Sequence, residues 1–284
     1  MIGLLLCGAP GIESSTPALG EEVARSGAIT MDRLLEEMTD MRRLAELPEP
    51  AYTTKQFSSY DRKSKSPTED WFANGDFNQF LRIEEVDGRK EHVMMDTDGP
   101  GVIVRIWSAN PKGNIRIYLD GSTTPAIEGR MDQLLGGSYP GLPKPIAGER
   151  SRGWNLYFPI PYAKHCKVTS DEPGFYYHIN YRTYETGTDL KTFERSDLER
   201  LSSRIQAVAG ALSEPRKGSD PPADRKKTPF EATLTPDASA ALAELKGSLA
   251  ICGLLFHIEA DDLAKAARAT VLDITFDGEK TVEC

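Results

Sequence analysis

The fold class is indicated first by residues 114–121, Asn114-Ile115-Arg116-Ile117-Tyr118-Leu119-Asp120-Gly121. Polar and apolar residues alternate along this stretch, and a strand that runs into Asp-Gly is a strong signal for a β-hairpin. The same signal recurs where residues 271–276 run into Asp277-Gly278. Further short runs rich in β-forming residues lie between Pro and Gly clusters, at 102–107, 154–158 and 175–181. Many short strands separated by turns predict an antiparallel jelly-roll β-sandwich.

Two helices are expected around this β-rich segment. Thr30 can cap the first, which has apolar residues at helical spacing and ends before Pro48. The second spans about residues 195–212, and a linker rich in Pro and basic residues follows it over 213–229. We therefore expect an all-β-dominated fold with an N-terminal helix and a helical insertion.

One jelly-roll domain is expected over residues 30–284. The helix and linker make an excursion from it over about 185–248. The sandwich core is expected over about 52–184, and the strands after Leu249 should complete it.

Residues 1–29 are expected to be disordered or to be the remnant of an export signal. The apolar run at residues 2–9 is far shorter than the ~20 residues that a membrane span needs. It also lacks the basic residues that open a signal peptide. A remnant signal would make the protein secreted or periplasmic, and the alternative is a disordered cytosolic start.

The composition narrows the possible partners. The formal net charge is −9 and argues against nucleic acid, whose phosphates repel an acidic surface. The chain has 4 cysteines, and their spacing matches no zinc pattern. Phosphate-loop, dinucleotide and nucleophile-elbow motifs are missing from the sequence, so we expect no cofactor and no metal. A neutral sugar suits this composition.

An irregular segment carries the candidate binding residues. It combines aromatic rings, carboxylates, an amide and a guanidinium in Tyr60, Asp61, Arg62, Trp71, Asn74 and Asp76. Sugar sites use this mixture, because flat rings pack on C–H faces while polar side chains bind hydroxyls. The alternative is a loop that pins the edge of the sandwich through a network of Asp61 and Arg62.

A second pair of carboxylates, Asp96 and Asp98, would share one face of a strand. Glycoside hydrolysis needs paired carboxylates. However, Asp98 runs directly into Gly99-Pro100-Gly101, and turn chemistry accounts for it without catalysis.

Several short motifs occur in an order that resembles a known family. They are Ser58-Ser59-Tyr60-Asp61-Arg62, Asn74-Gly75-Asp76, Asp98-Gly99-Pro100-Gly101-Val102-Ile103 with Ile106-Trp107, Ile117-Tyr118-Leu119-Asp120-Gly121, Tyr157-Phe158-Pro159-Ile160-Pro161-Tyr162, and Tyr176-Tyr177-His178-Ile179-Asn180-Tyr181. Together they resemble the domain of unknown function 2961, which is glycoside hydrolase family 172. The resemblance covers about residues 30–278.

The resemblance implies two jelly rolls per chain, assembly into homotrimers or larger rings, and retaining chemistry on α-fructofuranosides or arabinofuranosides. In that family the catalytic pair consists of two glutamates of the second jelly roll, in Gly-Glu-Gly-Glu and Thr-Glu-Asp-Tyr-Phe stretches. Neither stretch occurs in this sequence, so no catalytic residue is assigned. We expect the N-terminal portion of such an enzyme; the alternative is a stand-alone carbohydrate-binding or assembly module.

Overall fold

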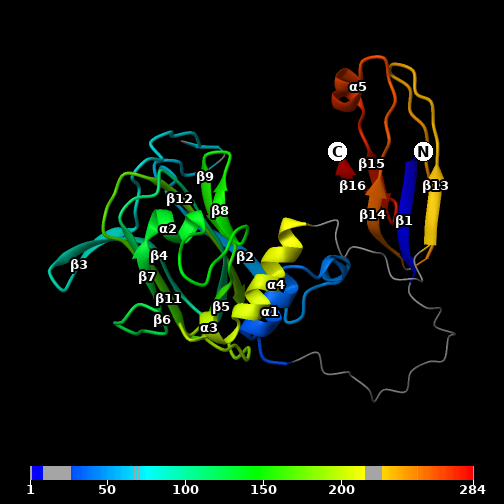
Figure 1. The fold of residues 1–284 in the computed structure, drawn as a ribbon. Helices are drawn as coiled ribbons and strands as arrows, with labels where there is room; N and C mark the ends of the chain where they lie inside the picture. The colour runs from blue at the N-terminus through cyan, green and yellow to red at the C-terminus, as the bar shows by residue number, and fades with distance from the viewer. Residues whose placement is uncertain are drawn as a thin grey trace. The chain divides into compact units, whose positions relative to one another are not determined.

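The computed structural model describes residues 2–8, 27–66, 68–69, 71–214, 226–247 and 249–283 (Figure 1). The chain forms two compact units. We call residues 17–220 the sandwich unit, and residues 1–16 together with 221–284 the second unit.

Two antiparallel sheets make up the sandwich unit. In spatial order the first contains β2 (Tyr52–Ser58), β12 (Tyr176–Tyr184), β5 (Gly101–Ala109), β9 (Gly153–Leu156) and β8 (Ala147–Arg150), with β10 (Ile160–Tyr162) also paired to β5. The second contains β3 (Arg82–Val86), β4 (Arg89–Asp98), β11 (His165–Ser170), β6 (Asn114–Leu119) and β7 (Ile127–Arg130). This arrangement confirms the predicted antiparallel β-sandwich.

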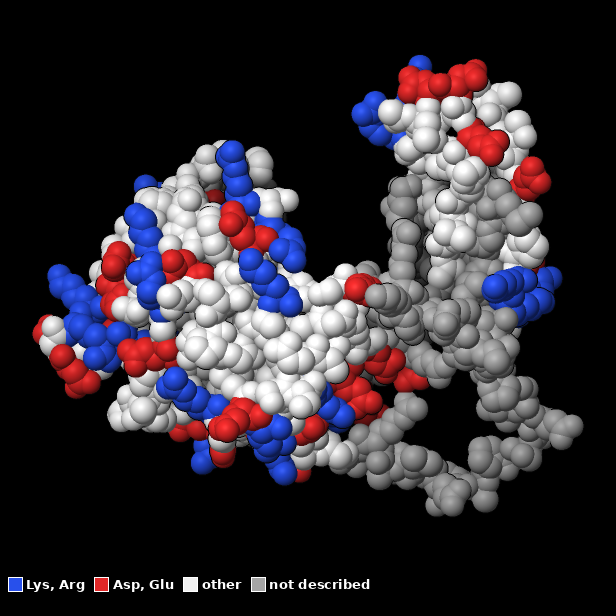
Figure 2. Space-filling model, viewed as in Figure 1, with Lys and Arg blue, Asp and Glu red and all other residues white. Residues whose placement is uncertain are grey.

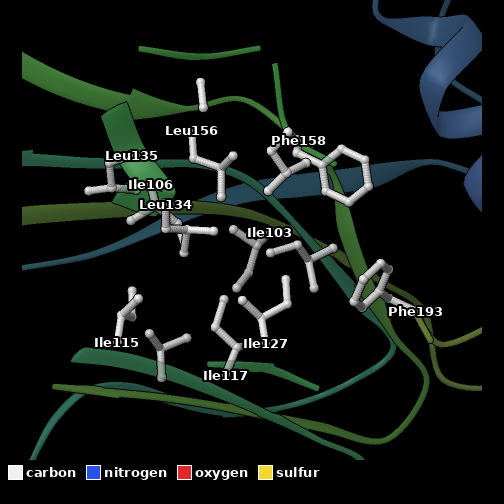
Figure 3. Close-up of a cluster of buried hydrophobic side chains, with 14 of the residues drawn as sticks. Ile103, Ile106, Ile115, Ile117, Ile127, Leu134, Leu135, Leu156, Phe158 and Phe193 are labelled. Atoms are coloured by element: carbon white, nitrogen blue, oxygen red, sulfur yellow. The ribbon is translucent and has the colours of Figure 1, made fainter. Parts of the chain in front are cut away.

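The core fills the space between these sheets (Figure 3). Ile103 and Ile106 of the first sheet and Ile115 and Ile117 of the second belong to one cluster of buried side chains. Helix α2 (Met131–Gly136) adds Leu134 and Leu135, both fully buried. Burying each such side chain stabilises the fold by roughly 1.5–3 kcal/mol.

Cys166 of β11 belongs to the same core and is fully buried. Burial raises the pKa of its thiol far above the ordinary value, because the thiolate would lose its hydration.

A β-bulge interrupts β5. Its pairing with β12 steps from Arg105 opposite Asn180 to Ile103 opposite Tyr181, which leaves Val104 as the extra residue. Ile103 and Ile106 can therefore both face the core although they are three residues apart, while Arg105 between them is only half-buried.

The N-terminal helix is shorter than the sequence predicted. Helix α1 (Met31–Glu37) begins at the expected cap, where Arg33 N–H donates to Thr30 Oγ1 at 3.3 Å. It ends before the 3₁₀ helix η1 (Met41–Ala45), in which Met41 and Leu44 remain exposed. The apolar stripe therefore packs on the sandwich up to Met38, and Met41 lies outside the packed face.

The second predicted helix is also broken. It consists of α3 (Asp197–Arg200) and α4 (Ser202–Ser213), which packs against α1. Leu201 and Ile205 are buried in the main core, so this segment belongs to the body of the sandwich unit. No helix in the described part of the chain is both long and apolar enough to cross a membrane.

Both Asp-Gly pairs form tight turns with positive φ. At Asp120-Gly121 the φ angles are 53° and 80°, but β7 pairs with β6 only from Ile127 onward, so a loop replaces the expected two-residue hairpin. Asp277-Gly278 joins β15 (Asp273–Phe276) directly to β16 (Glu279–Glu283), as predicted.

The strands of the second unit pair differently from the sequence expectation. Strand β14 (Leu249–Leu255) was expected to complete the sandwich, yet it pairs with β1 (Ile2–Gly8), whose other neighbour is β13 (Lys226–Phe230). The physical reason is the apolar run of β1, which was expected to lack structure but forms the centre of a three-stranded sheet. Helix α5 (Leu263–Ala269) completes the described part of this unit. Residues 9–26, within the segment expected to be disordered, and 215–225, within the expected linker, lie outside the described residues.

Candidate functional site

All six residues proposed for sugar binding lie in one connection of the sandwich unit, between β2 and β3. We call residues 59–80 the rim loop. Its start is tied to β12, because Ser59 N–H donates to the Tyr177 carbonyl and Tyr177 N–H donates to Ser59 Oγ, each at 3.1 Å. The loop is therefore fixed to a central strand of the sheet.

Asp61 holds the loop from within. Its side chain is buried and accepts hydrogen bonds from Lys63 N–H at 3.0 Å and Gly75 N–H at 2.9 Å. Its own N–H donates to Asp76 Oδ1 at 2.7 Å. The bond from the Lys63 backbone, reinforced by the one from Gly75, keeps the pKa of Asp61 below its usual range despite desolvation. The two ends of the predicted motif are thus joined through one carboxylate.

Gly75 is required by this arrangement. A Cβ at that position would lie 2.6 Å from Asp61 Oδ2, closer than any side chain tolerates. The glycine therefore allows the carboxylate to approach the backbone, and this contact places Asn74 and Asp76 on either side of it.

Arg62 braces the backbone and does not pair with Asp61. Its two terminal nitrogens donate to the carbonyls of Tyr60 at 3.0 Å and Ser58 at 3.1 Å. The guanidinium also lies 4.9 Å from the centre of the Tyr60 ring, a cation–π contact. Asp61 and Arg62 thus shape the loop separately, each through backbone groups.

Exposed aromatic rings line the rim loop. Trp71 and Phe72 are 66% and 67% exposed, and their ring centres lie 5.3 Å apart. Tyr60 is also exposed, as is Phe77, whose ring contacts that of Tyr176. Exposed apolar rings bordered by polar groups commonly mark a binding surface.

Next to the rim loop lies a polar and aromatic group that the sequence analysis did not identify. It occupies the outer face of β5, β9 and β12, where it consists of Arg105, Trp107, Asn155, His178 and Asn180, together with Tyr157 directly after β9. Burial, helped by the charge of Arg105, lowers the pKa of His178, whereas the carboxylate of Asp76 acts in the opposite direction. Asp76 therefore links the rim loop electrostatically to this face.

The other candidate carboxylates, Asp96 and Asp98, lie on the second sheet. Asp96 is engaged by Arg82 and by His165, whose Nε2 lies 2.7 Å from Asp96 Oδ1. Burial opposes ionisation of Asp96, but these two partners lower its pKa. Asp98 is exposed at the end of β4. Asp96 is a member of a surface ion-pair network, and turn chemistry remains sufficient for Asp98.

Two further features bear on the kind of ligand. Among the described residues, no three His, Cys, Asp or Glu side chains are grouped closely enough to hold a metal ion. Figure 2 shows acidic and basic side chains interspersed over the visible face of the sandwich unit. That face does not form the continuous basic surface that binds nucleic-acid phosphates.

The fold defines an antiparallel β-sandwich domain with a rim loop of aromatic and polar residues at one sheet. Residues 50–201 match the family model for the GH172 first beta-sandwich domain. This match spans more than half of the chain, which therefore belongs to glycoside hydrolase family 172, as the ordered motifs predicted. No curated protein matches the sequence.

Proposed function

We propose that this domain is the N-terminal part of a retaining glycoside hydrolase that acts on α-furanosides, either fructofuranosides or arabinofuranosides. Membership of the family supports a role related to glycoside hydrolysis. The observation that carries the proposal is the rim loop, where a buried carboxylate fixes a segment that presents Trp71 and Phe72 to solvent.

In this proposal the rim-loop residues have two roles, which are contact with the sugar and support of the loop. Trp71 packs against the apolar face of the sugar ring, and Tyr60, Asn74 and Asp76 offer hydrogen-bonding groups to its hydroxyls. Asp61 and Arg62 hold the loop in the conformation that presents them.

The bond-breaking step requires two carboxylates: one attacks the anomeric carbon, and the other serves first as acid and then as base. We assign neither to this chain, whose sequence lacks both glutamate stretches of the family resemblance. We further propose that the complete protein is secreted or periplasmic and forms homotrimers or larger rings, in which the rim loop completes a pocket made by another subunit.

Replacement of Trp71 by Ala tests the binding role. We expect sugar affinity to fall about tenfold, which corresponds to ~1–3 kcal/mol for a stacked ring. The melting temperature should stay nearly unchanged, because this side chain is mostly exposed. Binding of methyl α-arabinofuranoside and methyl α-fructofuranoside can be followed by ligand-observed NMR.

Phe276→Ala is the matched control, because it removes an exposed ring from the second unit. Unchanged affinity in Trp71→Ala, with a lowered melting temperature, would mean that Trp71 supports the fold and not the ligand.

The absence of assigned catalytic carboxylates gives a second prediction. The purified 284-residue chain should not hydrolyse aryl α-arabinofuranosides or α-fructofuranosides. Release of the aryl group can be followed by absorbance. Turnover that disappears when one carboxylate of this chain is mutated would contradict the assignment.

A further inference from the structure

On the outer face beside the rim loop, side chains form two rows that cross neighbouring strands. In one row, Asn180 of β12 lies between Gln56 of β2 and Arg105 of β5. In the other, Trp107 of β5 lies between His178 of β12 and Asn155 of β9. Strand register, and not a flexible loop, therefore fixes where these side chains stand.

Arg105 is held by two amide oxygens. Its Nε–H and one Nη2–H donate to Asn155 Oδ1 at 3.2 and 3.0 Å, and one Nη1–H donates to Asn180 Oδ1 at 3.4 Å. The amide groups are fixed in turn, because Asn155 Nδ2 donates to the Gly153 carbonyl and Asn180 Nδ2 donates to Gln56 Oε1. The planar guanidinium is therefore oriented in advance of any ligand.

This network leaves part of the guanidinium unused. Each terminal nitrogen carries two N–H groups, and the bonds above engage one of them on each. In the part of the chain that the structure describes, Arg105 also has no carboxylate partner, unlike Arg116, which pairs with Glu128, and Arg182, which pairs with Glu37. Two donors of a half-buried cation thus remain for a ligand.

Aromatic rings flank these donors. The Tyr157 ring centre lies 6.0 Å from the Arg105 guanidinium, and that side chain is exposed. The half-buried Trp107 contacts the His178 ring, with 4.7 Å between ring centres. Trp107 is tightly held, because a Cβ at Gly153 would lie 2.3 Å from its Nε1. The face therefore combines a donor fork with fixed apolar surfaces.

We propose that Arg105 is a sugar-binding residue, whose two free N–H groups donate to neighbouring hydroxyl oxygens of a neutral furanose ring. Trp107 and Tyr157 would contact the C–H edges of that ring. This inference rests on the proposed function and extends the site from the rim loop to the outer face of β5 and β9.

A neutral sugar fits this face better than an anionic one. The carboxylate of Asp76 acts on His178 at the same face, against the charge of Arg105, and the chain as a whole carries a net charge of −9. A planar fork also matches two adjacent hydroxyl oxygens in a way that the point charge of lysine does not.

Arg105→Lys tests the inference, because it keeps the positive charge but removes the planar guanidinium with its paired N–H donors. We expect affinity for methyl α-arabinofuranoside or methyl α-fructofuranoside to fall about tenfold or more in ligand-observed NMR. Arg130→Lys, an exposed arginine paired with Asp132, is the matched control and should bind like the wild type. In the wild type, the Nε–H resonance of Arg105 should shift as the sugar is added, which tests the contact without relying on a folded variant.

The outcomes separate this inference from the proposed function. Sugar binding that is lost in Trp71→Ala but unchanged in Arg105→Lys, with no shift of the Nε–H resonance, would overturn the role of Arg105 and leave the rim loop as the site. Binding of galacturonate in place of the neutral furanosides, lost in Arg105→Lys, would overturn the neutral-sugar assignment together with the proposed function. Failure of the wild type to bind either sugar at high millimolar concentration would overturn the inference as well.

Discussion

Asp61 shows how a single side chain can hold a loop. Its carboxylate accepts backbone hydrogen bonds from both ends of the motif, at Lys63 and Gly75. Each oxygen serves one N–H group, so the ionised form is the one that fits. The sequence indicated Asp61 as a candidate, but the residue type alone could not show whether its side chain contacts a ligand or supports the loop.

Asp61→Asn should therefore lower the melting temperature at neutral pH by several degrees, because one amide end would place a donor against a backbone donor. The pKa of Asp61 is lowered by folding. Its stabilising contribution is thus present above the unfolded pKa, ~4, and is lost as the pH falls through the folded value.

Thermal melting of both proteins from pH ~7 down to pH ~3 measures this effect. The difference between wild type and variant should shrink as the pH falls. A difference that is constant over this range would mean that the Asp61 charge does not hold the loop.

Arg105 was missed by the sequence analysis for a structural reason. Simple alternation along β5 places Ile103, Arg105 and Trp107 on one face, so an apolar residue and a cation appear to share an environment. The bulge at Val104 separates them by turning Ile103 toward the core. A bulge depends on pairing with β12, far away in the sequence, and local pattern does not reveal it.

At the level of elements, apolar periodicity predicted where the helices lie but not where they end. The stripe continues at helical spacing from Met31 to Ala45, but in the structure it serves as a packing face only up to Met38. Tertiary contacts with α4 help to decide where that face ends, and these involve residues more than 150 positions away.

Leu35→Ala tests this division of the stripe. Leu35 is fully buried, so its truncation should destabilise the sandwich unit by ~2–5 kcal/mol through lost burial and the cavity left behind. Met41→Ala, at a position that is 73% exposed, should change stability by less than ~0.5 kcal/mol. Denaturant unfolding followed by circular dichroism compares the two. Equal effects would show that the whole stripe packs as one helix.

At the scale of the whole molecule, β-richness and turn signals predicted the sandwich, whereas strand partners across long separations were not predictable. The Asp277-Gly278 hairpin forms as expected, but β14 pairs with β1. Both are apolar strands, and composition does not specify which strands find each other when several are available.

A fragment of residues 17–220 should fold on its own. The main core of the sandwich unit is built from residues between Met31 and Ala209. Among the described residues, every strand of its two sheets belongs to that unit. We expect its melting temperature to lie within ~2 °C of the corresponding transition of the full chain, measured by calorimetry. A fragment that is unfolded, or that melts far lower, would show that the sandwich depends on the second unit.

The buried thiol of Cys166 can report on opening of the sandwich. Its sulfur lies between the sheets and stays protonated at neutral pH, so an alkylating reagent meets neither an accessible nor a nucleophilic atom while the sheets are closed. Modification at this position must wait for the layers to separate. Its rate therefore records how often the native core opens, without any engineered label.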